Sequence, residues 1–408
     1  MEWKEVRLGD VCNIITGFPF PGKKYSKEGI RVVRGDNVTI GNLRWDTEKD
    51  KRWNEPFDKT EYYSLQANDI VIGMDGSRVG KNKARIKEED LPLLLAQRVA
   101  CVRHNELAEQ DYLYYNIFSK KFIDYVNSIH TGSAIPHISQ KQIEDYKILL
   151  PNLETQRRIA SILSSLDRKI ELNNKINADL EEMAQAVFKN WFVDFEPFKD
   201  SKFEDSELGM IPEGWKVGRL DEIADVVGGS TPSKAKPEYY TQKGIAWLTP
   251  KDLSNHPAVY TSRGEIDITE EGYNSTSTKL MPKGTVLFTS RAPIGYISIA
   301  QNDICTNQGF KSLVPKKAGT CFLYCFLKYV TPEIENKSTG STFKEASGSL
   351  MKSLQVIIPE QKAFEEFEAI VSPLFARIES LERENSRLSL LRDTLLPRLM
   401  SGELEVPE

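Results

Sequence analysis

The sequence predicts an α/β (α+β) protein made of two copies of one domain with a mixed, irregular sheet, and each copy continues into a long helix. Two observations support this fold class. The chain of 408 residues repeats itself in order at a shift of about half its length. Each copy also ends at a proline, Pro151 or Pro359, and continues into a long segment with helical apolar spacing. A repeat this long indicates two domains of one fold rather than a solenoid.

Four pairs of segments carry the repeat. They are 3–8 with 215–220, 68–71 with 283–286, 131–133 with 339–341, and 148–151 with 356–359. The shift between the copies drifts only from 208 to 215 residues, as short loop insertions would produce. We therefore divide the chain into domain 1 (1–150), helix 1 (151–192), a linker (193–212), domain 2 (213–358), helix 2 (359–400) and a tail (401–408).

Each domain is rich in short β-branched runs that are separated by Gly, Pro, Asn and Asp, and each contains one helix-like stretch. These helix-like stretches are 112–122 in the first copy and 322–329 in the second. The hydrophobic content of 40% allows a core in each copy. We expect a compact mixed α/β domain with an irregular sheet in each half.

The two long helices carry apolar stripes with alternating spacings of three and four residues. In helix 2 the stripe is Phe364, Phe367, Val371, Leu374, Ile378, Leu381, Asn385, Leu388 and Leu395; in helix 1 it is Ile159, Ile162, Leu166, Lys169, Asn173, Ile176, Leu180, Met183 and Val187. We predict that the helices form an antiparallel coiled coil, that Asn173 and Asn385 fix its register, and that the two domains are related by a pseudo-two-fold axis. The alternative is that each helix packs only on its own domain.

Composition limits the classes of function. No apolar run approaches the length of a membrane span and no secretory leader is evident, so we expect a soluble cytoplasmic protein without a membrane partner. The five cysteines favour core packing over disulfides or a metal site. The net charge of −5 is unevenly distributed, because 1–150 carries +1 and 210–358 carries +3. The two repeated domains can therefore present a basic face to nucleic acid.

Known catalytic signatures are missing from the sequence. There is no phosphate-binding G-x-x-x-x-G-K-[ST], no G-x-S-x-G, no H-E-x-x-H and no Asn-Pro-Pro-aromatic run of the amino-methyltransferases. We therefore predict no catalytic residue, no metal ligand and no cofactor. His130 and His137 flank one loop, and we favour a solvated or DNA-facing loop there over a metal pair.

Polar loops with basic and aromatic residues recur at matching places in both copies. Arg, Lys, Asn and Gln can pair with base edges, whereas Ser, Thr and backbone amides hold phosphates. The residues that we predict to contact DNA are Lys23, Lys24, Arg34, Asn37, Arg78, Lys81, Gln97, Arg98, Ser133 and His137 in the first copy, and Lys234, Lys236, Tyr239, Lys251, Arg291, Asn307, Gln308, Ser341 and Lys344 in the second. Each loop alone could be an ordinary turn. Because the loop tips differ between the copies, we expect two different half-sites.

Several segments resemble the specificity (S) subunits of type I restriction–modification systems. They are 188–197 and 207–215 at the central junction, 289–295, 306–310, and 395–402 with its Leu-Leu-Pro sequence. The resemblance implies two target recognition domains separated by the two central helices, which contact a bipartite site in double-stranded DNA. It also implies two methyltransferase (M) subunits as partners and, through them, restriction (R) subunits. In the first copy 74–78 departs from the Thr-Ser-Arg of the second.

Three hypotheses follow from the sequence. The first is a non-catalytic DNA-binding subunit, the second is an enzyme such as a stand-alone methyltransferase or nuclease, and the third is a coiled-coil adaptor that never touches bases. The missing motifs argue against the enzyme. The adaptor hypothesis predicts that changing Arg291 or Gln308 leaves DNA affinity unaltered.

Overall fold

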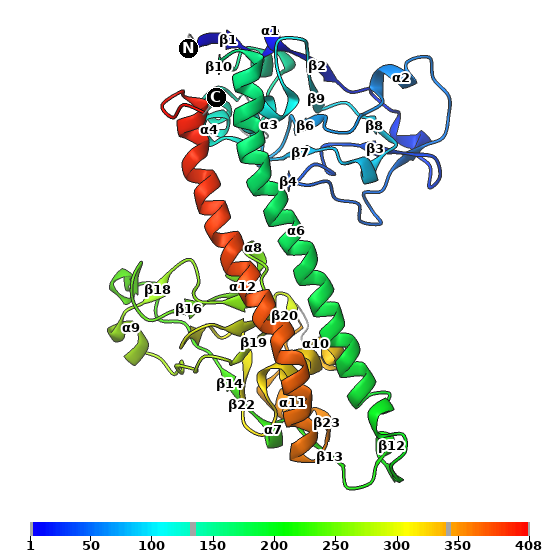
Figure 1. Ribbon diagram of the computed structural model, residues 1–408, viewed down its shortest axis with the longest axis vertical. Coiled ribbons are helices and arrows are strands. Elements are labelled where there is room, and N and C mark those ends of the chain that lie inside the picture. Colours follow the sequence, from blue (N-terminus) through cyan, green and yellow to red (C-terminus); the bar gives the residue numbers. More distant parts are fainter. Residues whose placement is uncertain (1–2, 131–135, 340–343, 407–408) are drawn as a thin grey trace. The chain divides into compact units, whose positions relative to one another are not determined.

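The computed structural model describes residues 3–130, 136–339 and 344–406, and it contains two compact units. Unit 1 comprises 1–169 together with 387–408, and unit 2 comprises 170–386. The division falls inside both long helices, α6 (Leu153–Phe192) and α12 (Gln361–Met400) (Figure 1). It does not coincide with the six ranges into which we divided the sequence, which stay predictions.

Unit 1 is built on a five-stranded sheet of order β2-β9-β6-β7-β4, with a three-stranded sheet β5-β3-β8 and the pair β1-β10. Its strands are β1 (Lys4–Arg7), β2 (Cys12–Thr16), β3 (Ile30–Val33), β4 (Ile40–Gly41), β5 (Arg52–Trp53), β6 (Ile70–Gly73), β7 (Lys83–Arg85), β8 (Leu93–Leu95), β9 (Val99–His104) and β10 (Lys147–Leu150). Its helices, besides parts of α6 and α12, are α1 (Leu8–Val11), α2 (Thr60–Tyr63), α3 (Gln110–Phe118), α4 (Lys120–Ile129) and α5 (Gln140–Glu144).

Unit 2 repeats this topology, because its five-stranded sheet has the order β14-β22-β19-β20-β17. Its strands are β11 (Phe203–Ser206), β12 (Gly209–Pro212), β13 (Lys216–Arg219), β14 (Ala224–Gly228), β15 (Tyr240–Thr241), β16 (Trp247–Leu248), β17 (Tyr260–Thr261), β18 (Asp267–Ile268), β19 (Val286–Ser290), β20 (Ile294–Ala300), β21 (Cys305–Thr306), β22 (Lys311–Pro315) and β23 (Gln355–Ile358). Its helices are α7 (Leu220–Ile223), α8 (Pro250–Asn255), α9 (Glu270–Asn274), α10 (Thr320–Lys337) and α11 (Gly348–Ser353).

The two sheets match strand by strand. In each, three antiparallel pairings are followed by one parallel pairing at the edge, β4 with β7 and β17 with β20. The central strands β6 and β19 are buried along their whole length, which explains their continuous apolar and small side chains. The predicted internal repeat is thus confirmed as a repeat of fold.

A glycine with positive φ lets a helix approach the sheet in both units. A Cβ on Gly80 (φ 78°) would lie 2.8 Å from a methyl group of Val126, and one on Gly295 (φ 97°) would lie 2.7 Å from a methyl group of Thr331. A larger residue at either position would therefore clash with the neighbouring helix as well as strain the backbone. These two glycines fix the distance between strand β7 or β20 and the helix that covers it.

Within each unit, α6 and α12 pack against one another and run antiparallel. In unit 2, Asn173 donates to Asn385 at 2.9 Å, while Phe188 packs against Phe367 with ring centroids 6.2 Å apart. In unit 1, Arg392 pairs with Asp167 at 2.8 Å, and the buried Ile159, Leu163 and Leu399 form a cluster with Tyr112 and Tyr115. The predicted antiparallel coiled-coil pair is confirmed.

The apolar stripe of α6 departs from the sequence prediction at Met183, while Ile159 and Asn173 are buried as predicted. Met183, which we placed in the stripe, is 53% exposed, whereas Ala184 and Phe188 are buried in the core of unit 2. The prediction failed at this position because it copied the spacing of α12 onto α6 at a fixed shift. The buried face of α6 follows the 3.6-residue period of a straight helix in this part instead.

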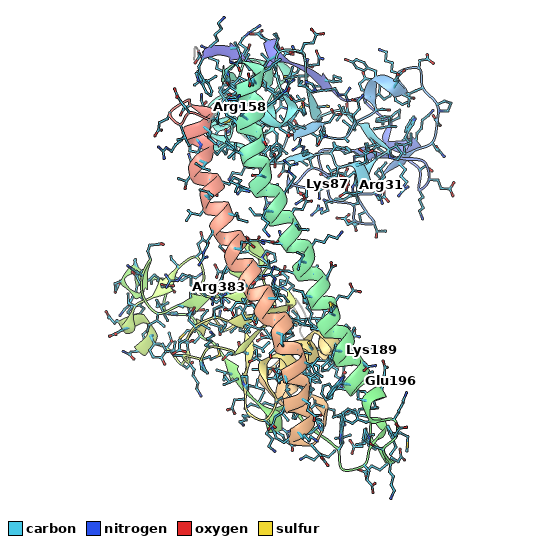
Figure 2. The ribbon with its side chains drawn as sticks, in the orientation of Figure 1. Arg31, Lys87, Arg158, Lys189, Glu196 and Arg383 are labelled. Carbon is cyan, nitrogen blue, oxygen red and sulfur yellow. The ribbon has the colours of Figure 1, made fainter. Side chains whose placement is uncertain are left out.

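The chain leaves α6 through an acidic junction that ends in the hairpin β11-β12. Lys189 near the end of α6 pairs with Asp194 at 2.6 Å, and Glu196 follows in a short 3-10 turn (Figure 2). Trp215 at the entry of domain 2 packs edge-on to Phe198, with ring centroids 4.7 Å apart. None of the helices in 3–130, 136–339 and 344–406 is long and apolar enough to cross a membrane.

Candidate nucleic-acid interface

Predicted DNA-contacting residues of the first copy meet in one cleft of unit 1, because they follow strands that end at the same edge. Arg34 follows β3, and Gln97 and Arg98 follow β8, which runs parallel to β3. The carboxyl ends of parallel strands lie side by side, so the loops after them converge. The cleft has a volume of about 570 Å³ and also includes Arg78, from the loop between β6 and β7.

The charge of this first cleft is predominantly positive. Its cationic side chains are Arg34, Arg44, Lys49, Arg78 and Arg98, and its acidic ones are Asp36 and Asp75. Five cations against two carboxylates favour binding of a polyanion.

Contacts within the first cleft orient its arginines. The guanidinium of Arg34 lies 5.7 Å from the ring of Tyr25 and 3.3 Å from Asp36. Arg98 adopts a left-handed backbone conformation (φ 66°), and its guanidinium binds the carboxylate of Asp75 at 2.9 Å. The side chain of Arg98 remains 71% exposed, so it is accessible to a ligand in the cleft.

The remaining predicted residues of the first copy lie in different places. Asn37 is fully buried, and its amide donates to the carbonyls of Arg44 and Lys49, so it shapes the loop below the cleft. Lys24 pairs with Glu55 at 2.9 Å, and His137 pairs with Asp75 at the cleft edge. Lys23 and Lys81 are exposed in loops that flank the cleft without lining it, and Ser133 lies outside the described residues.

Unit 2 contains the matching cleft, with a volume of about 920 Å³. The parallel strands β16 and β21 end at its floor, so that Lys251 and Asn307 meet there with Arg291 and Lys234. None of the described lining residues is acidic, and the lining includes Trp247, Tyr240, Pro237, Pro250 and Ile266. The second cleft is therefore more apolar than the first while keeping a positive charge.

The other predicted residues of the second copy that the structure describes do not line this cleft. Lys236 lies 4.9 Å from the ring centroid of Tyr239 and donates to its hydroxyl at 2.8 Å, a bond that raises the pKa of Lys236. Gln308 accepts a hydrogen bond from Thr231. Lys344 donates to the carbonyl of Glu335 at 3.3 Å, away from the cleft, and Ser341 lies outside the described residues.

Glycine brings the floor of each cleft together. A Cβ on Gly17 would lie 2.2 Å from the carbonyl oxygen of Ala96, and one on Gly229 would lie 2.1 Å from that of Thr306. No other residue fits at these crossings of backbone on backbone. They hold the loops of Gln97 and Gln308 directly over the first strand of each sheet.

Sequence reasoning missed several lining residues. Arg44, Lys49 and Asn82 line the first cleft, and Tyr240, Trp247 and Thr249 line the second. Arg44 and Lys49 escaped because we searched for loops that match between the copies. The alternation of basic and aromatic residues in 42–53 was the signal that could have found them.

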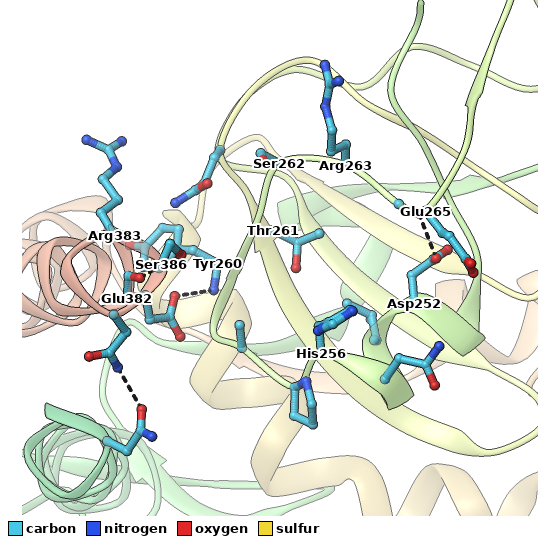
Figure 3. Close-up of a pocket in the computed structure, with 18 residues that line it drawn as sticks. Asp252, His256, Tyr260, Thr261, Ser262, Arg263, Glu265, Glu382, Arg383 and Ser386 are labelled. Carbon is cyan, nitrogen blue, oxygen red and sulfur yellow. Dashed lines mark hydrogen bonds between the residues drawn. The ribbon is translucent and has the colours of Figure 1, made fainter. Parts of the chain in front are cut away.

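A further pocket of about 580 Å³ lies in unit 2 between the 252–265 segment and α12 (Figure 3). Glu382 anchors it, because its carboxylate accepts hydrogen bonds from the backbone nitrogens of Val259 at 2.7 Å and Tyr260 at 3.0 Å. Burial raises the pKa of Glu382 to about 7, although these two hydrogen bonds oppose the shift. The contact fastens the loop before β17 to the long helix.

The cysteines are all unpaired and buried, and burial raises the pKa of Cys12 to about 12 and that of Cys305 to about 11. Such thiols are poor nucleophiles and poor metal ligands at neutral pH. Within the described part of the chain, no three His, Cys, Asp or Glu side chains gather as a metal site would require.

Comparison with known proteins places this arrangement in a family. The family model described as the type I restriction modification DNA specificity domain matches the chain twice, at 1–182 and at 212–390. The two matches coincide with the two halves of the internal repeat.

Individual relatives agree with the family model. The MjaIX specificity subunit of Methanocaldococcus jannaschii is 39% identical over 192 residues, which is 46% of this chain and 44% of that protein. The HindI specificity subunit of Haemophilus influenzae is 26% identical over 469 aligned positions, 99% of this chain and 100% of that protein. The crystal structure of an S subunit from M. genitalium has the same fold, with a TM-score of 0.59 at 17% identity, covering 98% of this chain and 96% of the other.

Proposed function

The chain belongs to the type I restriction modification DNA specificity family, and we propose that it recognises a bipartite site in double-stranded DNA through its two clefts, one for each half-site. Specificity subunits are the non-catalytic components of type I restriction enzymes, so the chemistry belongs to the subunits that they direct. The cleft of unit 1 receives one half-site and the cleft of unit 2 receives the other.

The observation that carries this proposal is the pair of matching clefts with an excess of positive charge. Basic side chains at the ends of parallel strands suit the phosphate backbone, and the arginines and amides among them suit base edges. The linings of the two clefts differ, since the first cleft contains two carboxylates and the second contains Trp247 and Ile266. Two clefts with different linings favour two different half-site sequences.

We further propose that α6 and α12 set the length of the unspecific spacer between the half-sites. Both helices run without interruption through the division between the two units. Their exposed faces carry charged side chains such as Arg157 and Arg383, which we propose as part of the docking surface for two methyltransferase subunits. Restriction subunits would join through these methyltransferases.

Selection from a pool of random duplexes tests the proposal. The full chain, assembled with its methyltransferase subunit, should select duplexes with two constant half-sites separated by a spacer of fixed length and free sequence. Substitution of Arg291 by Ala should relax one base pair in one half-site and weaken specific binding by about 1–3 kcal/mol. Selection that yields no bipartite consensus would refute the proposal.

The same assay separates the alternatives. A coiled-coil adaptor would show identical, sequence-independent binding for the native chain and for Arg291→Ala and Gln308→Ala. An enzyme would transfer methyl groups or cut DNA as the purified chain alone, which the proposal excludes.

A further inference from the structure

A carboxylate holds an arginine at the edge of each cleft. In unit 1, Asp75 binds Arg98 through one oxygen and His137 through the other. In unit 2, Glu345 lies 3.4 Å from Arg291 and 3.5 Å from Lys311. Each cluster joins the end of a central strand, β6 or β19, to a loop that returns to the sheet.

The backbone shows that these two clusters occupy equivalent places. The aligned hydrogen bonds run from Ile138 N to Met74 O (3.0 Å) and from Met74 N to Arg98 O (3.0 Å) in unit 1, and from Ala346 N to Ser290 O (2.9 Å) and from Ser290 N to Gly309 O (2.7 Å) in unit 2. Met74 therefore corresponds to Ser290, so Asp75 corresponds to Arg291. By the same bonds, His137 corresponds to Glu345.

The carboxylate and its partner exchange places between the two clusters. In unit 1 the strand end supplies the acid, Asp75, and the returning loop supplies the base, His137. In unit 2 the strand end supplies the base, Arg291, and the returning loop supplies the acid, Glu345. The pairing survives although both residues differ, which indicates that the contact itself has a role in each cleft.

Stability does not explain these pairs. The side chains of Arg98 and His137 are 71% and 45% exposed, and those of Arg291 and Glu345 are 36% and 38% exposed. Ion pairs with this much contact with water contribute little to folding. Orientation of a guanidinium does matter for recognition, because an arginine must present its donors in a fixed direction to pair with a base edge.

We propose that Asp75 and Glu345 are positioning residues that determine specificity, each by aiming one arginine, Arg98 or Arg291, into its cleft. This inference rests on the proposed function. Asp75 is itself only 20% exposed, as expected of a residue that supports a neighbour from below. Through His137, the same carboxylate ties the returning loop of unit 1 to the aimed arginine.

The test uses the full chain with its methyltransferase subunit and measures two quantities. One is the base preference at every position after selection from a random duplex pool, and the other is the ratio of the Kd for a random duplex to the Kd for the selected duplex. The positioning variants are Asp75→Asn and Glu345→Gln. The matched controls are Asp124→Asn, which faces Lys120 on α4 of unit 1, and Glu333→Gln, which faces Lys337 on α10 of unit 2; none of these four residues lines either cleft.

We expect Asp75→Asn to lower the Kd ratio by about threefold to thirtyfold and to relax one base pair of one half-site. Glu345→Gln should do the same in the other half-site, and Asp75→Glu should restore part of the ratio. The controls remove the same charge and should leave the base preferences unchanged. Equal profiles for Asp75→Asn and Asp124→Asn would overturn the proposal.

Arg98→Ala and Arg291→Ala separate a failure of this inference from a failure of the proposed function. If the arginine variants relax base preference while Asp75→Asn and Glu345→Gln do not, positioning by the carboxylates is wrong and the proposed function stands. If the arginine variants also keep every base preference, the assignment of the clefts falls and this inference falls with it. Thermal unfolding of each variant checks that it still folds. Glu345 is partly exposed, so we expect Glu345→Gln to disturb folding least.

Discussion

Lys83 and Glu382 keep ionisable groups away from water in places where each serves the backbone. Lys83 is 3% exposed, donates to the carbonyl of Gly80 at 2.9 Å and lies near the rings of Phe118 and Phe122. Glu382 accepts hydrogen bonds from the backbone nitrogens of Val259, just before β17, and of Tyr260, its first residue. Each side chain thus supports a loop next to a cleft or pocket, at a cost in desolvation.

Stability of unit 2 should depend on pH through Glu382. Burial raises the pKa of this carboxyl to about 7, so between about pH 4.5 and 7 the folded chain binds more protons than the unfolded chain. The stabilisation is complete below about pH 4.5 and is lost as the pH rises to about 7, by up to about 3 kcal/mol. Glu382→Gln should remove this loss, which thermal unfolding at several pH values measures. The exposed Glu271→Gln is the control, and an equal pH slope in both variants would contradict the prediction.

Lys83→Met should stabilise unit 1 below neutral pH. Burial lowers the pKa of Lys83 to about 7, so between about pH 7 and 10.5 the unfolded chain binds more protons and stability rises with pH. Methionine removes the cost of burying a charged ammonium group. The gain in free energy of unfolding over the native chain should therefore be larger at about pH 6.5 than at about pH 10, by up to about 5 kcal/mol. Denaturant unfolding at both pH values measures this gain, and the exposed Lys81→Met is the control. A gain in stability that does not depend on pH would contradict the role of the Lys83 charge.

Individual positions show what sequence can and cannot predict at this scale. Arg34, Arg98, Lys251 and Asn307 line the two clefts, and residue type and loop position suffice to mark them as candidates. Their contact with DNA stays a prediction. Asn37 shares both features and yet is buried, because its amide satisfies two carbonyls of a loop whose course no local pattern reveals.

At the scale of elements, the helix pair α6–α12 combines an aromatic core with a polar centre. Asn173 is fully buried and donates to Glu384 and Asn385, both at 2.9 Å, while its own side-chain oxygen has no hydrogen-bond partner among the described residues. Asn385 in turn donates to Asn174 at 2.8 Å. That these asparagines fix the register remains a prediction.

Asn173→Leu tests the register role. Burial of leucine instead of an incompletely satisfied amide should raise the stability of unit 2 by about 1 kcal/mol, while pairing in a shifted register becomes cheaper. Calorimetry should then show a higher unfolding temperature and a broader unfolding transition. Asn174→Leu, at an exposed position, should not stabilise; a loss of more than about 1 kcal/mol in Asn173→Leu would show that the amide is needed for stability itself.

The two long helices also show how far the apolar spacing in the sequence predicts which residues are buried. Alternating spacing predicted both helices and much of the stripe of α12, because Phe364, Phe367, Val371, Ile378 and Leu381 are all buried. The stripe of α6 was predicted wrongly around Met183, since Leu, Met and Ala are interchangeable in a periodic pattern when the partner surface is unknown. Only the packing of Ala184 and Phe188 in the core of unit 2 decides which residues face inward.

For the whole molecule, the proposal makes the helices a spacer between two recognition units. Insertion of one heptad in α6 after Lys169 and one in α12 after Ser386, where the units divide, should add about 10 Å of helix, or about three base pairs of DNA. The selected spacer should lengthen accordingly while both half-sites keep their sequence. Selection from the random duplex pool measures it.

A control insertion of seven residues in the β11-β12 turn, between Ser206 and Gly209, should leave the spacer unchanged. An unaltered spacer after the double helix insertion would show that α6 and α12 do not set the distance. Insertion in one helix alone should disrupt pairing, because the stripes would no longer face one another.

The division of the chain also dictates an order of folding during synthesis. Unit 2 is a single stretch, 170–386, whereas unit 1 needs both 1–169 and 387–408. The cluster around Ile159 and Leu163 is completed only by Leu399 and Val406, which leave the ribosome last. Unit 2 can therefore finish folding while unit 1 still waits for its final residues. A chain that stops before Leu399 would carry one complete unit and one unit with an incomplete core.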